Sequence, residues 1–193
     1  MARVSITQTV HAHLTSIIQK GDRVVDATLG NGHDTLFLAR AIGDEGHLYG
    51  FDIQEQAIIS SLDKLASHQL TSRTTLLQKS HQFMDDYIPS RDHGRIKSIV
   101  FNLGYLPSSD KSITTQPQST LSALNLSLNL LSEDGVISIL AYTGHPGGEE
   151  ECNAVKSWVS KLSPENYKTS IINLLPDHDS PPEWILISKT QTE

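Results

Sequence analysis

A turn with two glycines, between a short apolar run and a helical pattern, constrains the fold of this chain more than any other stretch. The run at 23–25 leads to the carboxylate of Asp26, Gly30 and Gly32 follow, and helical spacing begins at Thr35. Glycine lets the backbone turn sharply and come close to a ligand, because it has no Cβ. The first N–H groups of a helix have no partner within it, so they face whatever lies in the turn. This order predicts a strand, a ligand-binding turn and a helix.

An acidic residue stands where nucleoside cofactors are usually held. Asp52 ends a second predicted strand, 47–52, and lies twenty residues after Gly32. An acid at this spacing accepts hydrogen bonds from ribose hydroxyls. The dinucleotide fingerprint would require a third glycine at the position of Thr35, which disfavours a nicotinamide cofactor. The turn and its acids therefore predict a nucleoside-cofactor site. The alternative is a glycine-rich turn that closes an ordinary strand–helix unit.

Length and charge limit the class of protein. The 193 residues suit one α/β domain, 1–193, with a substantial core. The net charge of −7, without a basic run, argues against a dedicated nucleic-acid-binding module. It is compatible with an enzyme that binds RNA through a local basic patch. The single cysteine, Cys152, excludes an internal disulfide framework. No stretch has the ~20 apolar residues of a membrane span. We therefore expect a cytoplasmic protein with no membrane partner.

Strand and helix patterns alternate along the chain and end in two successive strands. A helix predicted at 7–20 comes first and packs on the core through residues such as Val10 and Leu14. The apolar continuity of the fifth strand, 135–142, indicates a sheet buried on both faces. We predict a doubly wound, Rossmann-like α/β sheet, mostly parallel, with an antiparallel C-terminal edge strand. The other predicted strands are 23–26, 47–52, 74–78, 96–101, 168–174 and 184–188, and the other helices are 54–69, 83–88, 120–131 and two that begin at Thr35 and Glu149.

The segment after the fourth strand carries the residues best suited to catalysis. In open α/β sheets, ligands bind beyond the carboxyl ends of the strands, where Asn102-Leu103-Gly104-Tyr105 lies. The Asn102 side-chain carbonyl, together with a nearby backbone carbonyl, can accept N–H groups of a ligand and fix its orientation. Tyr105 is suited to pack on a flat base. The alternative is a strand-end turn that uses Asn and Gly for their backbone tolerance.

Two further segments face the same edge of the sheet. Ser80 and His81 follow the third strand, where His81 either contacts a cofactor ring or is an ordinary, partly exposed histidine. Tyr142 and His145 follow the fifth strand and are expected to contact substrate, and a plain loop histidine is the alternative at His145. The acidic and histidine residues at 177–179 lie in a proline-rich turn without the fixed frame that metal ligands need, so no metal is predicted.

The glycine turn resembles motif I of class I S-adenosylmethionine methyltransferases. Asp26 matches the acid of that motif, Gly30 and Gly32 match its last two glycines, and Thr28 replaces the first. The segment 102–105 resembles the Asn/Asp-Pro-Pro-Tyr signature of enzymes that methylate amino nitrogens, with Leu-Gly in place of Pro-Pro. The resemblance implies catalytic roles for Asn102 and Tyr105, substrate contacts by Gly104, Tyr105, Tyr142 and His145, and S-adenosylmethionine contacts by Asp26, Thr28, Gly30, Asn31, Gly32, His33, Asp34, Asp52, Ile53, Gln54, Ser80, His81, Asn102 and Leu103.

Together with Pro181-Pro182, these motifs resemble the small bacterial family labelled as rRNA methylases, over nearly the whole chain. Its members include a tRNA methyltransferase. The resemblance therefore implies methylation of the amine of 5-aminomethyl-2-thiouridine at the tRNA wobble position, with the anticodon loop as partner and a homodimer as the assembly. The alternatives are methylation of rRNA or of a small amine, a nicotinamide-dependent reductase, and a non-catalytic nucleoside-binding protein.

Such a substrate places two demands on the chain. An alkyl amine resembles lysine, with a pKa of about 10.4, so it arrives mostly protonated and must lose a proton before it attacks. The sequence identifies no base for that step. Phosphate groups require local positive charge. The candidates for a cationic rim are Arg3, Lys20, Arg91, Arg95 and Lys111.

Overall fold

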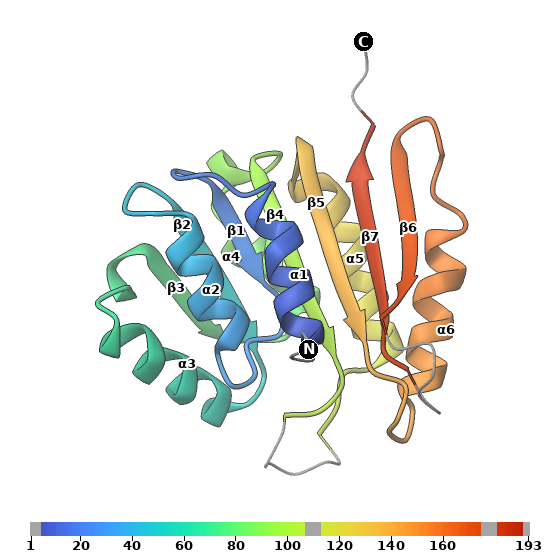
Figure 1. Ribbon diagram of the computed structural model, residues 1–193, viewed down its shortest axis with the longest axis horizontal. Helices are drawn as coiled ribbons and strands as arrows, with labels where there is room; N and C mark the ends of the chain where they lie inside the picture. Colours follow the sequence, from blue (N-terminus) through green and yellow to red (C-terminus); the bar gives the residue numbers. More distant parts are fainter. Residues whose placement is uncertain (1–4, 107–112, 175–180, 191–193) are drawn as a thin grey trace, which may run out of the picture.

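The computed structural model describes residues 5–106, 113–174 and 181–190, within which seven strands form one sheet (Figure 1). The strand order is β3-β2-β1-β4-β5-β7-β6. The strands from β3 to β5 pair in parallel, and β7 is antiparallel to both of its neighbours. The bounds are β1 Arg23–Asp26, β2 His47–Asp52, β3 Thr74–Gln78, β4 Ile96–Leu103, β5 Leu131–Ala141, β6 Tyr167–Asn173 and β7 Glu183–Lys189.

Helices cover both faces of the sheet. On one face, α1, α2 and α3 pack against strand residues such as Val24 and Leu48, and on the other face α4, α5 and α6 pack against residues such as Ile99 and Ile137 (Figure 1). The α-helices are α1 Ile6–Thr15, α2 His33–Ala41, α3 Glu55–Ser67, α4 Met84–Tyr87, α5 Pro117–Leu130 and α6 Gly148–Val159, with 3-10 turns at Thr71–Arg73, His81–Phe83 and Ser90–Asp92. The predicted doubly wound, mostly parallel sheet with two buried faces is therefore confirmed.

The first helix is shorter than the predicted 7–20. It begins at a capping box, in which the Ser5 hydroxyl accepts from the Gln8 backbone N–H and the Gln8 side chain accepts from the Ser5 N–H. It ends at Thr15, where the hydroxyls of Thr15 and Ser16 donate 2.7 Å hydrogen bonds to the carbonyls of His11 and His13. Hydroxyl side chains of this kind compete with the helical hydrogen-bond pattern. The prediction that α1 packs on the core is confirmed, because Val10 and Leu14 are buried.

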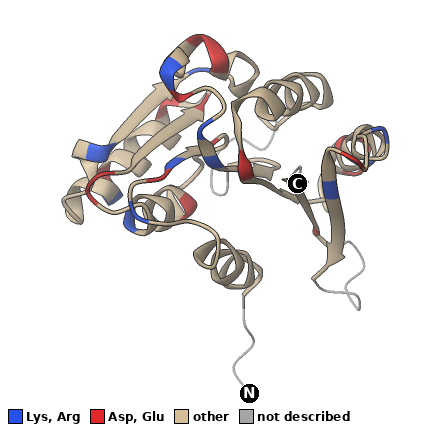
Figure 2. Cartoon of the chain, turned by 90° about the horizontal axis from the view of Figure 1, so that it is seen from above, with Lys and Arg blue, Asp and Glu red and all other residues tan. Residues whose placement is uncertain are grey.

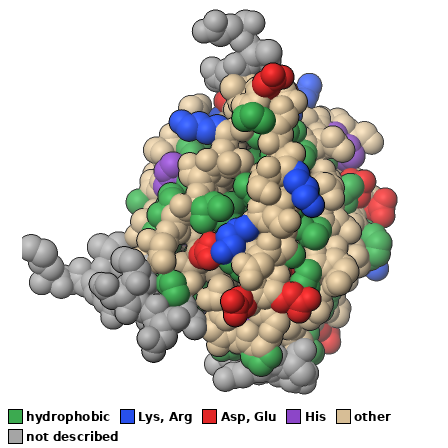
Figure 3. Space-filling view, turned by 90° about the vertical axis from the view of Figure 1, so that its right-hand side faces the viewer, with side chains coloured by type: hydrophobic (Ala, Val, Ile, Leu, Met, Phe, Trp, Pro, Cys, Tyr) green, Lys and Arg blue, Asp and Glu red, His purple; other side chains and the backbone are tan. Residues whose placement is uncertain are grey.

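The C-terminal strand is antiparallel, as predicted, but it does not lie at the edge. β7 pairs with β5 on one side and β6 on the other, so the edge strand is β6. The alternation of buried residues along β7 explains this position: Trp184 packs toward the α1 face, where its indole N–H donates to the Ser138 hydroxyl at 3.0 Å, and Ile185 and Ile187 pack toward the opposite face. The strand β6 is mostly exposed, and Figure 3 views the molecule from that side, where apolar, acidic and basic side chains are interspersed.

The strand order places a crevice between β1 and β4. The chain runs from β1 outward to β2 and β3, and then returns to start β4 on the other side of β1. Ligands of open α/β sheets bind at the carboxyl ends of the strands at such a reversal. None of the described helices combines the length and apolar character that crossing a lipid bilayer requires.

Candidate active site

A cleft of about 1130 Å³ opens at the carboxyl edge of the sheet, beyond the ends of β1 and β4. Loops after β1, β2, β3, β4 and β5 line it, and α1 contributes one wall. The structure therefore brings together segments that are distant in the sequence. The predicted site residues that line the cleft are Thr28, Gly30, Asn31, His33, Asp34, Asp52, Ile53, Gln54, Ser80, His81, Asn102, Leu103, Gly104, Tyr105, Tyr142 and His145.

Asp26 lies behind the cleft and does not line it. Its side chain is fully buried, and its carboxylate accepts hydrogen bonds from the Thr35 hydroxyl at 2.7 Å and the Thr28 N–H at 3.2 Å. Burial, assisted by the nearby Asp34 carboxylate, raises the pKa of Asp26 to about 7, although the two hydrogen bonds oppose this rise. Asp26 therefore braces the turn from within, and its contact with a cofactor stays a prediction.

Gly32 also lies outside the cleft, for a packing reason. It caps α2 with a φ of +73°, and a Cβ at this position would lie 2.8 Å from the Cα of Ser61 in α3. Glycine is thus required here for the close approach of α2 and α3, and not for the approach of a ligand. Gly30, with a φ of +52°, is the glycine that faces the cleft.

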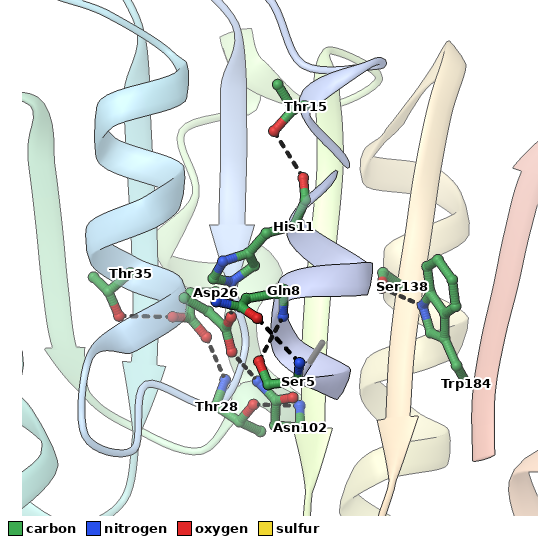
Figure 4. Close-up of polar contacts among 11 residues, drawn as sticks. Ser5, Gln8, His11, Thr15, Asp26, Thr28, Thr35, Asn102, Ser138 and Trp184 are labelled. Carbon is green, nitrogen blue, oxygen red and sulfur yellow. Dashed lines mark hydrogen bonds and ion pairs between the residues drawn. The ribbon is translucent and has the colours of Figure 1, made fainter. Parts of the chain in front are cut away.

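Thr28, which replaces the first glycine of motif I, joins the turn to the end of β4. Its hydroxyl accepts a 2.7 Å hydrogen bond from the backbone N–H of Asn102 (Figure 4). The neighbouring Ala27 N–H donates to the Val100 carbonyl at 2.8 Å, so the parallel pairing of β1 and β4 continues into the turn. A hydroxyl at this position fixes the two segments that carry the site relative to each other, which glycine could not do.

Asp52 combines a structural role with free acceptor capacity. Its two oxygens accept from the N–H groups of Gly30 at 3.0 Å and Gln54 at 2.9 Å. Burial raises the pKa of Asp52 despite these hydrogen bonds. A carboxylate offers about four lone-pair positions, so acceptor capacity remains for a ligand. Asp52 lines the cleft, and this is the arrangement that a ribose diol requires.

His81 is buried, unlike the partly exposed histidine of the alternative reading. Its Nδ1 donates to the Ala27 carbonyl at 3.1 Å, and burial lowers the pKa of the ring, so the imidazole is neutral. The proton on Nδ1 leaves a lone pair on Nε2, which has no hydrogen-bond partner among the described residues. A buried acceptor without a partner, on a ring that lines the cleft, is suited to an amino group such as that of adenine.

Asn102, Asp34 and His11 form a chain of contacts across the cleft. The Asn102 side-chain N–H donates to one oxygen of Asp34, and Nε2 of His11 contacts the other. Figure 4 shows His11 of α1 and Asn102 of β4 reaching the same place, beside Asp26 and Thr28. A carboxylate only accepts hydrogen bonds, so the amide nitrogen of Asn102 must face Asp34. The Asn102 carbonyl is thereby left as the acceptor that amine orientation needs.

The segment after Asn102 is held in place by hydrogen bonds that lead to a buried glutamate. Gly104 donates its N–H to the Thr115 hydroxyl at 2.9 Å, and that hydroxyl donates to Glu151 at 2.5 Å. Thr120 donates to the other Glu151 oxygen at 2.6 Å, and burial raises the pKa of Glu151. This network could not be predicted from the sequence, because its members lie on three separate segments.

The backbone carbonyls beside Asn102 already have one partner each. The Leu103 carbonyl accepts from the Tyr142 N–H at 3.2 Å, and the Gly104 carbonyl accepts from the Thr115 N–H at 3.0 Å. A carbonyl oxygen has two lone pairs, so each can accept one more hydrogen bond. Tyr105 stands perpendicular to the His145 ring, with 5.6 Å between the ring centroids. The rings of Tyr105 and His145, both predicted to contact substrate, therefore lie together.

The first two α-helices supply cleft residues that the sequence interpretation did not assign to the site. The local signal for His11 is weak: this residue directly follows the buried Val10 and so borders the packed face of α1. Where α1 crosses the sheet is a tertiary property without a local pattern. The additional lining residues from these helices and the residue before α1 are Ser5, Ile6, Thr7, Gln8, His11, Leu36, Phe37 and Arg40.

The predicted cationic rim is wrong for the residues that the structure describes. Lys20 precedes β1, and Arg91 and Arg95 precede β4, so all three lie at the amino edge of the sheet, opposite the cleft. Arg40 and Lys79 line the cleft instead. Figure 2 shows Lys and Arg scattered over the chain without a continuous stripe. Arg3 and Lys111 lie outside the described residues.

The described part of the chain contains neither a cluster of metal ligands nor a reactive thiol. No group of three or more His, Cys, Asp or Glu side chains in that part could hold a metal ion. The predicted non-metal turn at 177–180 lies outside it, and Pro182 lines the cleft. Burial raises the pKa of the Cys152 thiol to about 11, which is typical of a structural cysteine.

The sequence matches a protein family and a plant relative. Residues 48–188 match the family described as "Putative rRNA methylase". An Arabidopsis thaliana protein named tRNA (mnm5s2U34)-methyltransferase, chloroplastic, is 39% identical over 168 residues, which are 83% of this chain and 61% of that protein. The chain thus spans about three fifths of the length of this relative.

Two solved structures share both fold and sequence with the chain. A Clostridium thermocellum protein described in the same words as the family is 37% identical, with a TM-score of 0.91 and coverage of 98% of this chain and 100% of that one. A Streptococcus mutans methyltransferase in complex with SAH is 31% identical, with a TM-score of 0.84 and coverage of 98% and 99%. The Rossmann-like fold of class I methyltransferases, predicted from the sequence, is therefore confirmed.

Proposed function

The chain belongs to the family described as "Putative rRNA methylase", and from this membership we propose that it is an S-adenosylmethionine-dependent methyltransferase acting on tRNA. The proposed substrate is the aminomethyl group of 5-aminomethyl-2-thiouridine at the wobble position, and the product is its methylaminomethyl form. The name of the Arabidopsis relative, which specifies that methylated uridine, supports this substrate. The proposal includes a single domain, 1–193, a cytoplasmic location, and a homodimer that rests on the resemblance alone.

One observation carries the proposal: a nucleoside-binding half and an amine-orienting half share one cleft. Asp52 has spare acceptor positions for a ribose, and His81 has a buried Nε2 without a partner. Across the cleft, Asn102 is fixed by Asp34 with its carbonyl free to accept. The cleft volume of about 1130 Å³ leaves space for a cofactor and for part of a substrate. The residues present therefore fit S-adenosylmethionine.

The chain's own residues position the reacting groups. S-adenosylmethionine, when bound, supplies a methyl group on a positively charged sulfur. Asn102 accepts an N–H of the substrate amine and turns its lone pair toward that methyl group. Tyr105 packs on the uridine base, and the network of Thr115 and Glu151 holds the Gly104 backbone that connects these two residues. Arg40 and Lys79 are the proposed phosphate contacts at the cleft.

The test is transfer of labelled methyl from S-adenosylmethionine to tRNA from cells that lack this gene, followed by mass spectrometry of the nucleosides. We expect 5-methylaminomethyl-2-thiouridine as the product and a loss of rate of about a hundredfold or more for Asn102→Ala, because the amine loses its orientation. Asn153→Ala, at an exposed position of α6, is the matched control and is expected to retain full activity.

The alternatives predict other outcomes. Incorporation into rRNA would preserve the chemistry and overturn the substrate. Thermal stabilisation by S-adenosylhomocysteine without methyl transfer to any RNA would favour a small amine as substrate or a binding role. Stabilisation by NAD instead would favour the reductase alternative.

A further inference from the structure

His11, Asp34 and Asn102 meet in the cleft from three different elements, and Asp34 is the centre of the group. One Asp34 oxygen contacts Nε2 of His11, and the other accepts from the Asn102 side chain. The three residues belong to α1, the first turn of α2 and β4, and all of them line the cleft. The side chains of His11 and Asp34 are 21% and 16% exposed, so both are mostly enclosed yet reachable from the cleft.

Packing fixes the orientation of the His11 ring. The ring lies flat on Phe37 of α2, with 3.9 Å between centroids and 9° between planes. This stacking restricts rotation of the ring and keeps Nε2 at the Asp34 carboxylate. A carboxylate accepts hydrogen bonds, so the neutral imidazole carries its proton on Nε2 and presents a lone pair at Nδ1. No hydrogen bond among the described residues involves Nδ1.

The proposed reaction has a step that none of the residues described above performs. The substrate arrives as R–CH2–NH3⁺, because an alkyl ammonium has a pKa of about 10.4. This form has no lone pair, so it cannot attack a methyl group until one proton leaves. A base must lie within hydrogen-bond reach of that proton, directly or through one water molecule. The amine is oriented by Asn102, which is bonded to Asp34.

We propose that His11, held by Asp34, is the base that removes the proton from the substrate ammonium. This inference rests on the proposed function. One N–H bond of the ammonium breaks, its electron pair stays on nitrogen, and the proton passes to Nδ1 of His11. The nitrogen lone pair then forms the bond to the methyl carbon, while the electron pair of the carbon–sulfur bond goes to sulfur. The Asp34 carboxylate stabilises the imidazolium, which later returns its proton to water.

Several ionisable groups surround the pair. Asp26 of β1 and Tyr142, after β5, interact electrostatically with Asp34, and His33 and Arg40 of α2 line the same cleft. The Asp34 carboxylate favours a cation beside it, which applies both to an arriving ammonium and to a newly formed imidazolium.

The test compares single-turnover methyl transfer to tRNA between pH 6 and 9.5 in the wild type and in His11→Gln, which retains an N–H for Asp34 but cannot take a proton. His13→Gln, at an exposed position of the same helix, is the matched control. We expect His11→Gln to lose about 10²- to 10⁴-fold in rate at pH 7, the usual contribution of a general base, with affinity for S-adenosylhomocysteine unchanged. The deficit should shrink about tenfold per pH unit as the free amine fraction rises.

A wild-type rate in His11→Gln at pH 7, or a deficit that stays constant across the pH range, would overturn the role of His11 as base. Asp34→Asn is the second variant, and we expect it to show the same pH-dependent deficit because the imidazolium loses its counter-charge. Failure of the wild type to methylate the tRNA, with S-adenosylhomocysteine still bound, would instead overturn the proposed function, and this inference with it.

Discussion

At the scale of single residues, two carboxylates line the cleft and a third lies behind it, and the three have different surroundings. Asp26 is fully buried and accepts only from its own turn, whereas Asp52 accepts from two backbone N–H groups and keeps acceptor positions facing the cleft. Asp34 joins two side chains, one of them a histidine. Identical functional groups thus serve as a brace of the turn, as the proposed ribose acceptor and as the partner of the proposed base.

Asp26 is expected to make stability depend on pH. A carboxyl whose pKa is raised on folding, here from 3.8 to about 7, stabilises the fold most below pH 3.8, and this contribution is lost as the pH rises to about 7. The shift corresponds to roughly 4 kcal/mol. Asp26→Asn removes the titration, so its free energy of unfolding should fall less than that of the wild type between pH 5 and pH 8. Urea unfolding at both pH values measures this, and parallel pH curves for the two proteins would contradict the prediction.

Some site residues could be predicted at this scale because their signals are local. Gly30 and Asp52 lie at fixed distances along a strand–turn–helix unit, and spacing alone identifies them. The contact of His11 with Asp34 spans 23 positions and depends on where α1 crosses the turn, for which the sequence has no local pattern. The burial of His81 and Asp26 was likewise hidden, since burial depends on the elements that pack around a residue.

At the scale of elements, the site depends on how closely α2 approaches α3. Gly32 begins α2, and the space for a Cβ is occupied by Ser61 of α3. The position of α2 in turn sets the positions of Asp34 and Phe37, which hold His11. A change at Gly32 should therefore reach the site through packing, although Gly32 does not line the cleft.

Gly32→Ala and Gly94→Ala separate backbone strain from packing. The two glycines have φ values of +73° and +72°, but a Cβ at Gly94 meets nothing within 4 Å, whereas one at Gly32 lies 2.8 Å from the Ser61 Cα. Both variants should lose about 1 kcal/mol to left-handed backbone strain. Gly32→Ala should lose about 2 kcal/mol more through overpacking, measured as a lower urea midpoint with an unchanged m-value. Equal losses in the two variants would mean that the contact with Ser61 relaxes freely.

Most element types could be predicted from periodicity, and the errors have identifiable physical causes. β3 was predicted at its observed bounds because turn residues flank it on both sides. α1 ends early because hydroxyl side chains at Thr15 and Ser16 bond to its carbonyls. The interior place of β7 could not be predicted, because hydropathy gives the class of a strand but not which neighbours it pairs with.

At the scale of the whole molecule, an acidic protein is proposed to bind a polyanion. The net charge is −7, and the cations that the structure places at the cleft are Arg40 and Lys79, whereas Lys20, Arg91 and Arg95 lie at the opposite edge. Electrostatic attraction to RNA must therefore come from the cleft alone, and the number of phosphate contacts must be small. Such an interface would suit a short loop better than a long helix.

The dependence of tRNA affinity on salt measures that number. For two phosphate contacts on a single-stranded loop, log K should fall with log[salt] with a slope of about −1.4. Arg40→Gln should make the slope shallower by about 0.7, since one contact is lost. Arg95→Gln, at the opposite edge of the sheet, should leave the slope unchanged. A slope near zero in the wild type, or equal effects of the two variants, would contradict a cleft-centred electrostatic interface.

The inserted position of β7 has a consequence for how the chain folds as it is made. β5 and β6 leave the ribosome before the strand that joins them, because β7 follows both in the sequence. Until residues 183–189 emerge, the newly made β5 has an open edge and β6 has no neighbour to pair with. Synthesis at about 5–20 residues per second makes this an interval of seconds, during which the partly built sheet exposes unpaired backbone to other chains. The sheet is thus completed only after β7 has been synthesised, and pairing of β7 determines when the open edge of β5 is covered.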